Sequence, residues 1–305
     1  MRTLIVHNPR SGFNSDAIFE FERALLDAGD ECVFRMLAED EILSTTLTDA
    51  ESFDLIVVSG GDGTVAHALY ALRYRQVPVL VFPSGTANLI AANIGNANEP
   101  HALAAACKAG KVVHCDLGEA RWTDSAGTNW QLGLALMGGS GFDAQLMHDA
   151  IPAKDLLGEA AYFAAALGNL RPSFTTFTVE VDGVAHHHRG ISCLVTNNAM
   201  MQGEIEIVPG SSMTDGLIDV AVLESRNSTG LLKPIVAGIM DPTGTEVGRP
   251  EIAWYRGKHI SVHSEEPLRM EIDGDVIGTD ATDWEVQVLP RCVPVIVDQY
   301  SRYTS

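Results

Sequence analysis

The chain has 305 residues, of which 46% are hydrophobic, enough for one large domain or two domains of ordinary size. Its 40 acidic residues against 20 basic ones give a formal net charge of −20 at pH 7. A surface of this charge disfavours nucleic acid as a partner, and it disfavours tight docking on anionic lipid head groups.

The cysteine pattern and the short apolar runs bear on where the protein works. The five cysteines include no CxxC pair, which is typical of reduced thiols in a cytosolic protein. The N-terminal apolar run is too short for a signal peptide, and no segment approaches the roughly 18 apolar residues of a membrane span. We therefore expect a cytoplasmic protein that is peripheral to a membrane at most and contacts it transiently.

The first third of the chain alternates between two hydrophobic periods. Short apolar runs predict strands at 3–7, 31–37, 53–59 and 77–82, and helical spacing predicts helices at 15–28, 39–47, 64–74, 86–94 and 100–110. The run at 53–59 is apolar without alternation, which is typical of a strand buried on both faces. Repeated β-α units of this kind predict a parallel, doubly wound sheet.

After about residue 112 the pattern changes to short strands separated by turn signals such as Val-Asp-Gly-Val at 181–184. One helical insert is expected at 155–170, and the last stretch, 293–301, can return to the first domain. We predict an α/β domain formed by 1–115 together with about 291–305. A second domain, 116–290, is expected to be a mainly antiparallel β-sandwich.

Three glycine-containing loops in the first domain each follow a predicted strand directly. They are "HNPRSG" (7–12), "SGGDGT" (59–64) and "PSGTAN" (83–88). In a doubly wound sheet, ligands bind at the carboxyl ends of the strands, so these loops should gather at one edge. Glycine lets backbone N–H groups approach an anion, and a helix N-terminus adds positive potential. The loops therefore predict a phosphate cradle, although the chain lacks the GxxxxGK[ST] motif of ordinary P-loop proteins.

The carboxylate of Asp62 stands among these glycines and cannot favourably face a bare phosphate. A magnesium ion between them resolves the conflict, because Mg²⁺ is commonly held by one or two carboxylates plus substrate phosphates. The hydroxyl groups of Thr64 and Thr86 can donate hydrogen bonds. The residues thus predict a site for a nucleotide and Mg²⁺.

The order of the motifs resembles that of the diacylglycerol kinase catalytic-domain family, which includes sphingosine kinases and bacterial soluble lipid kinases. The motifs that carry this resemblance are "NPRSG", "GGDGT", "PSGTAN", "GFDA" (141–144), "LLGEAAY" (156–162), "NNAMMQG" (197–203), "PGSSMTDGLIDV" (209–220) and "IDGD" (272–275). The GGDGT motif alone is shared with NAD kinases. The later motifs make the lipid-kinase branch the better match.

The resemblance implies an NAD kinase/diacylglycerol kinase-like α/β domain, a β-sandwich lipid-substrate domain, and ATP bound in the cleft between them. The implied activity is transfer of the γ-phosphoryl group of ATP to the hydroxyl of diacylglycerol or a related lipid alcohol, a step of phospholipid biosynthesis. The residues that match the family's ATP-binding positions are Asn8, Pro9, Ser11, Gly12, Gly60, Gly61, Asp62, Gly63, Thr64, Gly85, Thr86 and Asn88. A second copy of the chain is a candidate partner.

The resemblance also implies metal and catalytic residues. Asp62 would organise the catalytic Mg²⁺, and Asp215 would hold a structural Mg²⁺ with backbone carbonyls near Ser212 and Leu217. From the residues alone, Asp215 is a turn residue. Asp275 stands where the family usually carries Glu as the base for the acceptor hydroxyl, so its reach is shorter by one methylene. A misplacement of about 1 Å can cost on the order of a hundredfold in rate.

Further departures keep two other functions open. Asp273 could share the role of the base, or "DGD" could be only an acidic hairpin turn. Ala66 and His67 replace an Asn-Glu pair that is frequent in the family, and Leu89 replaces an Asp. The alternatives are an NAD kinase-like enzyme and a catalytically impaired, nucleotide-binding regulatory protein.

Overall fold

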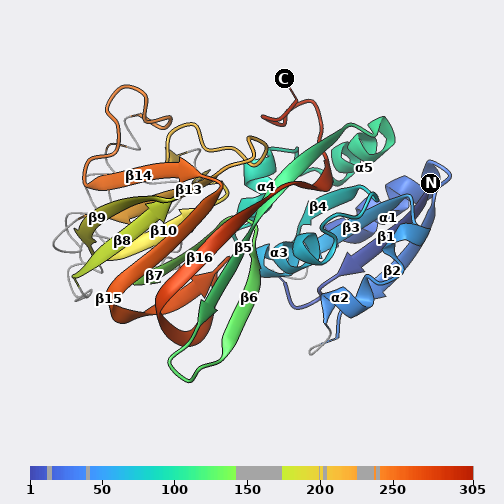
Figure 1. Cartoon of the computed structure of the whole chain (residues 1–305). Helices are drawn as coiled ribbons and strands as arrows, with labels where there is room; N and C mark the ends of the chain where they lie inside the picture. The colour runs from blue at the N-terminus through green and yellow to red at the C-terminus, as the bar shows by residue number, and fades with distance from the viewer. Residues whose placement is uncertain are drawn as a thin grey trace. The chain divides into compact units, whose positions relative to one another are not determined.

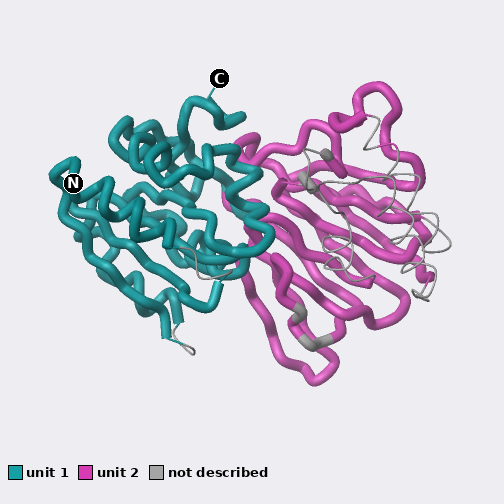
Figure 2. Tube along the Cα trace, turned by 180° about the vertical axis from the view of Figure 1, so that it is seen from behind, with its two compact units in different colours: residues 1–117, 290–305 teal, residues 118–289 magenta. Residues whose placement is uncertain are grey.

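The computed structural model describes residues 1–11, 16–38, 42–141, 174–198, 200–201, 205–224, 237 and 241–304. The chain divides into two compact units (Figure 2). Unit 1 is Met1–Leu117 with Pro290–Ser305, and unit 2 is Gly118–Leu289. Several features expected from the sequence lie outside the described residues: Gly12, residues 39–41 of a predicted helix, the motif residues 142–144, the helical insert with its motif at 156–162, and residues 199 and 202–203 of the motif at 197–203.

Unit 1 contains a parallel sheet with the strand order β2-β1-β3-β4-β16. These strands are β2 (Glu31–Met36), β1 (Arg2–His7), β3 (Leu55–Gly60), β4 (Val79–Pro83) and the C-terminal end of β16 (Asp275–Ile296). Strand β3 is buried along its whole length, as its unbroken apolar run indicates. The predicted parallel α/β fold is confirmed.

Helices cover both faces of this sheet (Figure 1). Ile5 is paired with Val57, and Val57 is paired with Leu80, on neighbouring strands. Paired residues point to the same face of a sheet, so these three side chains share a face. They form one buried cluster with α1 (Ala17–Asp27) and α5 (Pro100–Ala109). Shorter elements complete the unit, and they are α2 (Leu43–Thr46), η1 (Ala50–Ser52), α3 (Asp62–Ala71) and α4 (Leu89–Ile94).

The two helices that follow the second and third glycine loops begin elsewhere than the sequence pattern predicts. Helix α3 begins at Asp62 rather than at residue 64, so the carboxylate belongs to its first turn. Helix α4 begins at Leu89 rather than at residue 86. The cause is Asn88, which has a left-handed backbone and whose side chain bonds both the N–H (2.7 Å) and the carbonyl (2.8 Å) of Gly85. These side chain–backbone bonds compete with helix formation.

Unit 2 is the predicted β-sandwich, and its strand pairs are antiparallel. One path of strands runs β14-β13-β10-β7-β15-β16, with β5 and β6 attached at β16, and β8 and β9 attached at β15. The strands are β5 (Val112–Thr123), β6 (Asn129–Leu134), β7 (Met137–Gly141), β8 (Thr175–Val181), β9 (Val184–Gly190), β10 (Ser192–Thr196), β11 (Met200–Met201), β12 (Ile205–Glu206), β13 (Ile218–Leu223), β14 (Ile252–Gly257) and β15 (His259–Ile272).

The core of unit 2 consists of inward side chains from both ends of this strand path, among them Phe177, Val220 and Trp284. The predicted hairpin at 181–184 is present, with left-handed backbone at Asp182 (φ 49°) and Gly183 (φ 86°) between β8 and β9. In the described part of the chain, every helix is too short or too polar to cross a lipid bilayer.

Candidate functional site

The carboxyl ends of β1, β3 and β4 lie side by side and carry the three glycine loops. His7 is paired with Ser59, and Gly60 is paired with Pro83 across the parallel strands. The pairing continues into the loops, because the N–H of Asn8 donates to the carbonyl of Ser59 (2.8 Å). The loops therefore share one edge of the unit 1 sheet, as the strand order requires.

Side chains and glycine backbone hold the three loops together. The Asn8 amide donates to the Thr64 hydroxyl (2.8 Å), and the N–H of Gly61 donates to the Ser11 hydroxyl (3.0 Å). The second and third loops touch through backbone, because a Cβ added to Gly85 would lie 2.5 Å from the Cα of Gly61. Among the predicted nucleotide-binding residues that the structure describes, these five are joined by contacts, and so is Asn88 through its bonds to Gly85.

Asp62 connects the beginning of α3 to the beginning of α4. Its Oδ1 accepts a hydrogen bond from the N–H of Ile90 (2.8 Å), and the residue is half-buried. Its Oδ2 accepts no hydrogen bond from the described residues. One carboxylate oxygen next to the glycine loops fits Mg²⁺, which takes few protein ligands and completes its shell with phosphates and water. The described residues contain no cluster of three or more His, Cys, Asp or Glu suited to a metal.

A partly buried series of hydrogen bonds among His7, Ser59 and Ser84 was not predicted from the sequence. The His7 ring Nδ1 bonds the Ser59 hydroxyl (2.8 Å), which in turn bonds the Ser84 hydroxyl (2.5 Å). The His7 ring also packs edge-on against Phe19 and Phe34. His7, Ser59 and Ser84 lie at or next to the carboxyl ends of β1, β3 and β4. A polar residue at the end of each strand is the sequence signal that could have indicated these hydrogen bonds.

Burial gives His7 a testable pH dependence, because it lowers the pKa of the imidazole below its ordinary value of 6.5. As pH falls below about 6.5, the unfolded chain takes up a proton that the folded chain does not, so the free energy of unfolding decreases. For one group the slope is at most about 1.4 kcal/mol per pH unit. Above about pH 7 the effect is absent.

The matching variant is His7→Asn, which places an amide near the position of Nδ1 and cannot titrate. Denaturant unfolding from pH 5 to 8 should show wild type losing stability towards pH 5 more steeply than the variant. Equal slopes for the two proteins, or a steeper one for the variant, would contradict this account of His7.

The "IDGD" motif forms the hairpin turn between β15 and β16 in unit 2. Asp273 (φ 50°) and Gly274 (φ 90°) are left-handed, and Ile272 is paired with Asp275 at the first rung of the hairpin. Asp275 is exposed, whereas Asp273 is only 9% exposed and both its oxygens accept backbone hydrogen bonds. This geometry argues against Asp273 as a second base, because its oxygens are occupied by amide donors.

The segment that contains Asp215 is a turn leading into β13. The N–H of Leu217 donates to the Asp215 carboxylate (2.9 Å), and Gly216 has φ 74°. The Ser212 hydroxyl accepts a hydrogen bond from the N–H of Thr214 (3.2 Å). These bonds account for the Asp-Gly pair as a turn, and the magnesium role implied for Asp215 stays a prediction.

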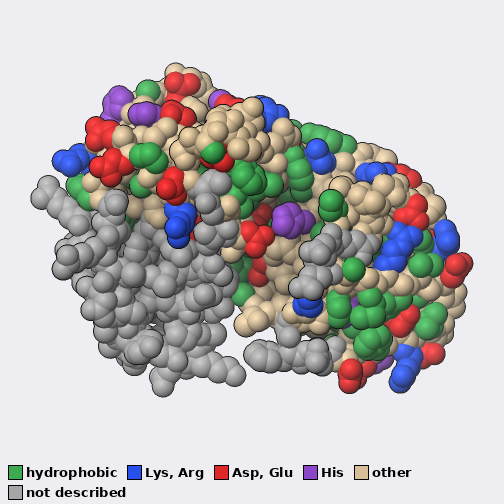
Figure 3. All heavy atoms as spheres, turned by 90° about the horizontal axis from the view of Figure 1, so that it is seen from below, with side chains coloured by type: hydrophobic (Ala, Val, Ile, Leu, Met, Phe, Trp, Pro, Cys, Tyr) green, Lys and Arg blue, Asp and Glu red, His purple; other side chains and the backbone are tan. Residues whose placement is uncertain are grey.

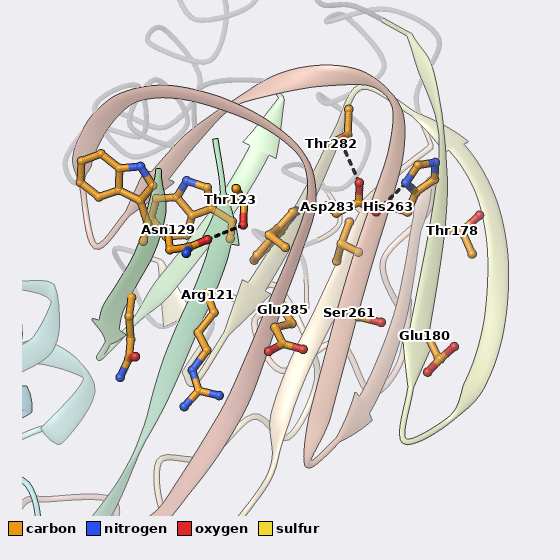
Figure 4. A pocket seen from close by; sticks show the side chains of 15 residues that line it. Arg121, Thr123, Asn129, Thr178, Glu180, Ser261, His263, Thr282, Asp283 and Glu285 are labelled. Carbon is orange, nitrogen blue, oxygen red and sulfur yellow. Dashed lines mark hydrogen bonds and ion pairs between the residues drawn. The ribbon is translucent and has the colours of Figure 1, made fainter. Parts of the chain in front are cut away.

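Unit 2 also carries a groove of about 740 Å³ on strands β5, β6, β8, β15 and β16 (Figure 4). Most of its lining residues are polar, and Trp122, Trp130 and Trp284 add apolar surface. The His263 ring bonds the Asp283 carboxylate (2.8 Å), and the Thr123 hydroxyl bonds the Asn129 side chain (2.8 Å). None of the residues predicted for ATP, metal or catalysis lines this groove.

Comparison with known proteins covers both units. Residues 2–120 match the family model described as the diacylglycerol kinase catalytic domain. Residues 138–297, more than half of the chain, match the YegS C-terminal NAD kinase beta sandwich-like domain. The chain belongs to the family of diacylglycerol kinases and YegS-like lipid kinases.

Individual relatives agree with this assignment. The diacylglycerol kinase of Bacillus subtilis (strain 168) is 28% identical over 290 residues, which cover 91% of this chain and 90% of that protein. A protein of Stenotrophomonas maltophilia (strain K279a) named "Probable lipid kinase YegS-like" is 28% identical over 249 residues, 78% of this chain and 76% of that one. The crystal structure of a diacylglycerol kinase from Bacillus anthracis str. Sterne shares the fold, with a TM-score of 0.69, 17% identity, and coverage of 98% of this chain and 97% of that one.

Proposed function

We propose that this lipid kinase family member transfers the γ-phosphoryl group of ATP to the hydroxyl group of diacylglycerol or a related lipid alcohol. The observation that carries the proposal is the convergence of three glycine loops at one sheet edge, with the Cα of Gly61 close against Gly85. Glycines at this edge carry no side chains, so phosphate oxygens can approach the loop backbone closely. Family membership supports the lipid as acceptor.

Phosphoryl transfer requires mainly positioning and charge neutralisation. In the proposed complex the loops that contain Asn8, Gly61 and Gly85 hold the phosphates of ATP. Asp62 holds Mg²⁺ through the oxygen that is not bonded to Ile90. When bound, the metal supplies neutralisation of the charge on the transferred group.

The proposed base is Asp275, whose carboxylate is exposed in unit 2. It accepts the proton of the lipid hydroxyl while that oxygen forms a bond to the γ-phosphorus. The bond from the γ-phosphorus to the oxygen bridging it to the β-phosphorus breaks, and ADP leaves. A positioned general base contributes about 10²–10⁴-fold to such a step.

The test of this function is transfer of label from γ-labelled ATP to a mixed lipid extract in the presence of Mg²⁺. We expect wild type to label a lipid and Asp275→Asn to lower kcat by about 10²-fold or more, because the amide cannot accept the proton. Asp275→Glu keeps a carboxylate that can accept the proton, so it should be faster than Asp275→Asn. An Asp275→Asn variant as fast as wild type would exclude Asp275 as the base.

A parallel assay with NAD as the acceptor and labelled ATP separates the alternatives left open by the sequence. An NAD kinase-like enzyme would convert NAD to NADP at a robust rate, which would contradict the lipid proposal. A nucleotide-binding regulatory protein would bind Mg·ATP without labelling any lipid. Family membership favours the lipid acceptor over both.

The membrane contact proposed for such an enzyme must accommodate the net charge of −20. On the face of the molecule seen in Figure 3, acidic and basic side chains are interspersed over the described residues. We propose that the protein takes its lipid from neutral or mixed membranes through a locally non-acidic surface. Tight binding to anionic vesicles at low salt without divalent ions would contradict this.

A further inference from the structure

We infer that Asp273 is a positioning residue for phosphoryl transfer, and that it acts together with Asn197 by fixing the chain segment 135–137. This segment joins β6 to β7 and lies against the turn that presents Asp275. The inference rests on the proposed role of Asp275 as the base. It assigns a different role to the carboxylate two residues before it.

The carboxylate of Asp273 collects three consecutive backbone donors. Its Oδ2 accepts the N–H of Ala135 (2.7 Å), and its Oδ1 accepts the N–H groups of Leu136 (2.8 Å) and Met137 (3.0 Å). Ala135 and Leu136 are buried, as is Asp273 itself. Without these bonds the burial of a carboxylate would be strongly unfavourable, so the donors and the charge depend on each other.

The carbonyl groups of the same segment are held as well. The Asn197 side chain donates to the carbonyl of Ala135 (3.0 Å), and its backbone N–H donates to that of Leu136 (2.8 Å). The N–H of Asp273 donates to the carbonyl of Met137 (2.8 Å). Every N–H and carbonyl of 135–137 is therefore bonded to Asp273 or Asn197, two residues from distant motifs, and Asn197 is only 1% exposed.

This hydrogen-bond network (residues 135–137, Asn197 and Asp273) determines the position of Asp275. Asp273 has a left-handed backbone, which a non-glycine residue keeps only when its surroundings hold it there. Asp275 follows after one glycine and is paired with Ile272, so a rotation of Asp273 would carry Asp275 with it. A base already shortened by one methylene tolerates little displacement, since about 1 Å can cost on the order of a hundredfold in rate.

The test variant is Asp273→Asn, which keeps the side-chain shape but turns one acceptor into a donor facing an N–H group. We expect its kcat for lipid phosphorylation to fall by about 10- to 100-fold while the KM for ATP is unchanged. The matched control is Asp182→Asn. Asp182 also has a left-handed backbone (φ 49°) and is followed by a glycine. Its carboxylate accepts hydrogen bonds from the N–H groups of Lys258 and His259, at the opposite end of β15. We expect this control to keep its kcat within about twofold of wild type.

A double-mutant cycle separates positioning from a general loss of structure. If Asp273 acts through Asp275, Asp273→Asn should slow the Asp275→Asn variant by less than about twofold, measured with enzyme in excess over labelled ATP. An equal factor in both backgrounds, or an equal loss of kcat in Asp182→Asn, would overturn the inference while leaving the proposed function intact. A wild-type protein without lipid kinase activity would instead remove the proposed function and the inference with it.

If Asp273→Asn does not fold, Asn197→Ala gives the same test with a milder change. It removes one bond to the carbonyl of Ala135 and leaves the Asp273 carboxylate in place. We expect kcat to fall about 3- to 10-fold, and this fall should vanish in the Asp275→Asn background. A fall that persists there, or unchanged kcat in a folded variant, would overturn the inference.

Discussion

Asp62→Asn is expected to lose lipid phosphorylation by about 10³-fold or more, the scale on which removal of a preorganised charge acts in phosphoryl transfer. The variant separates the two roles of this side chain. Asparagine keeps an oxygen that accepts the N–H of Ile90 (2.8 Å in wild type), so the link between α3 and α4 is preserved. It lacks the negative charge proposed to hold Mg²⁺.

The measurements are kcat with saturating ATP across a range of Mg²⁺ concentrations, and thermal melting of the variant without ligand. We expect melting close to that of wild type and a rate that added Mg²⁺ does not restore. The control is Asp62→Ala, which also removes the acceptor for Ile90 and should melt at a lower temperature than Asp62→Asn. Near-normal turnover by Asp62→Asn would show that the charge of Asp62 is not needed.

The second large effect is expected from Gly85→Ala. A methyl group at this position would lie 2.5 Å from the Cα of Gly61, closer than non-bonded carbon atoms approach, and the obstacle is backbone rather than a flexible side chain. The loop at 83–88 must therefore move away from the loop at 59–64. We expect a loss of about 3 kcal/mol in the free energy of unfolding and a Tm lower by roughly 5 °C or more. The Kd for Mg·ATP should rise at least about tenfold, because the phosphate cradle is opened.

Gly61→Ala is the matched control, because it places a methyl group at the same contact from the other side. A Cβ at Gly61 would meet the Cα of Gly85 at 3.8 Å, an ordinary van der Waals distance, and the backbone angles (φ −79°, ψ 175°) suit any residue. Its Tm should stay within about 2 °C of wild type. Equal melting temperatures for the two variants would mean that the loops are not packed as described.

The fold could be predicted because the local patterns and the final packing agree. The apolar run at β3 indicates a strand covered on both faces, and helices cover both faces of that sheet. The predictions that were wrong concern the ends of single elements. A helix is predicted over 86–94, yet Asn88 bonds Gly85 and the helix begins only at Leu89.

Some features of the candidate site could be predicted from the sequence motifs, and others could not. Convergence of the glycine loops follows from one expectation, a parallel sheet, so the motifs sufficed. The hydrogen-bonded chain of His7, Ser59 and Ser84 depends on the register of three strands, which no single motif contains. The role of Asp273 depends on N–H groups more than 130 positions away in the chain. A sequence pattern shows an acidic turn there but does not reveal its donors.

Whether the protein is a lipid kinase is decided by the stoichiometry of the reaction with a purified diacylglycerol in neutral mixed micelles, Mg²⁺ and γ-labelled ATP. We expect one labelled, organic-extractable lipid phosphate for each ADP formed, with both products absent in Asp62→Asn. Formation of ADP without lipid phosphate, or binding of Mg·ATP with neither product across a panel of lipid alcohols, would contradict this expectation.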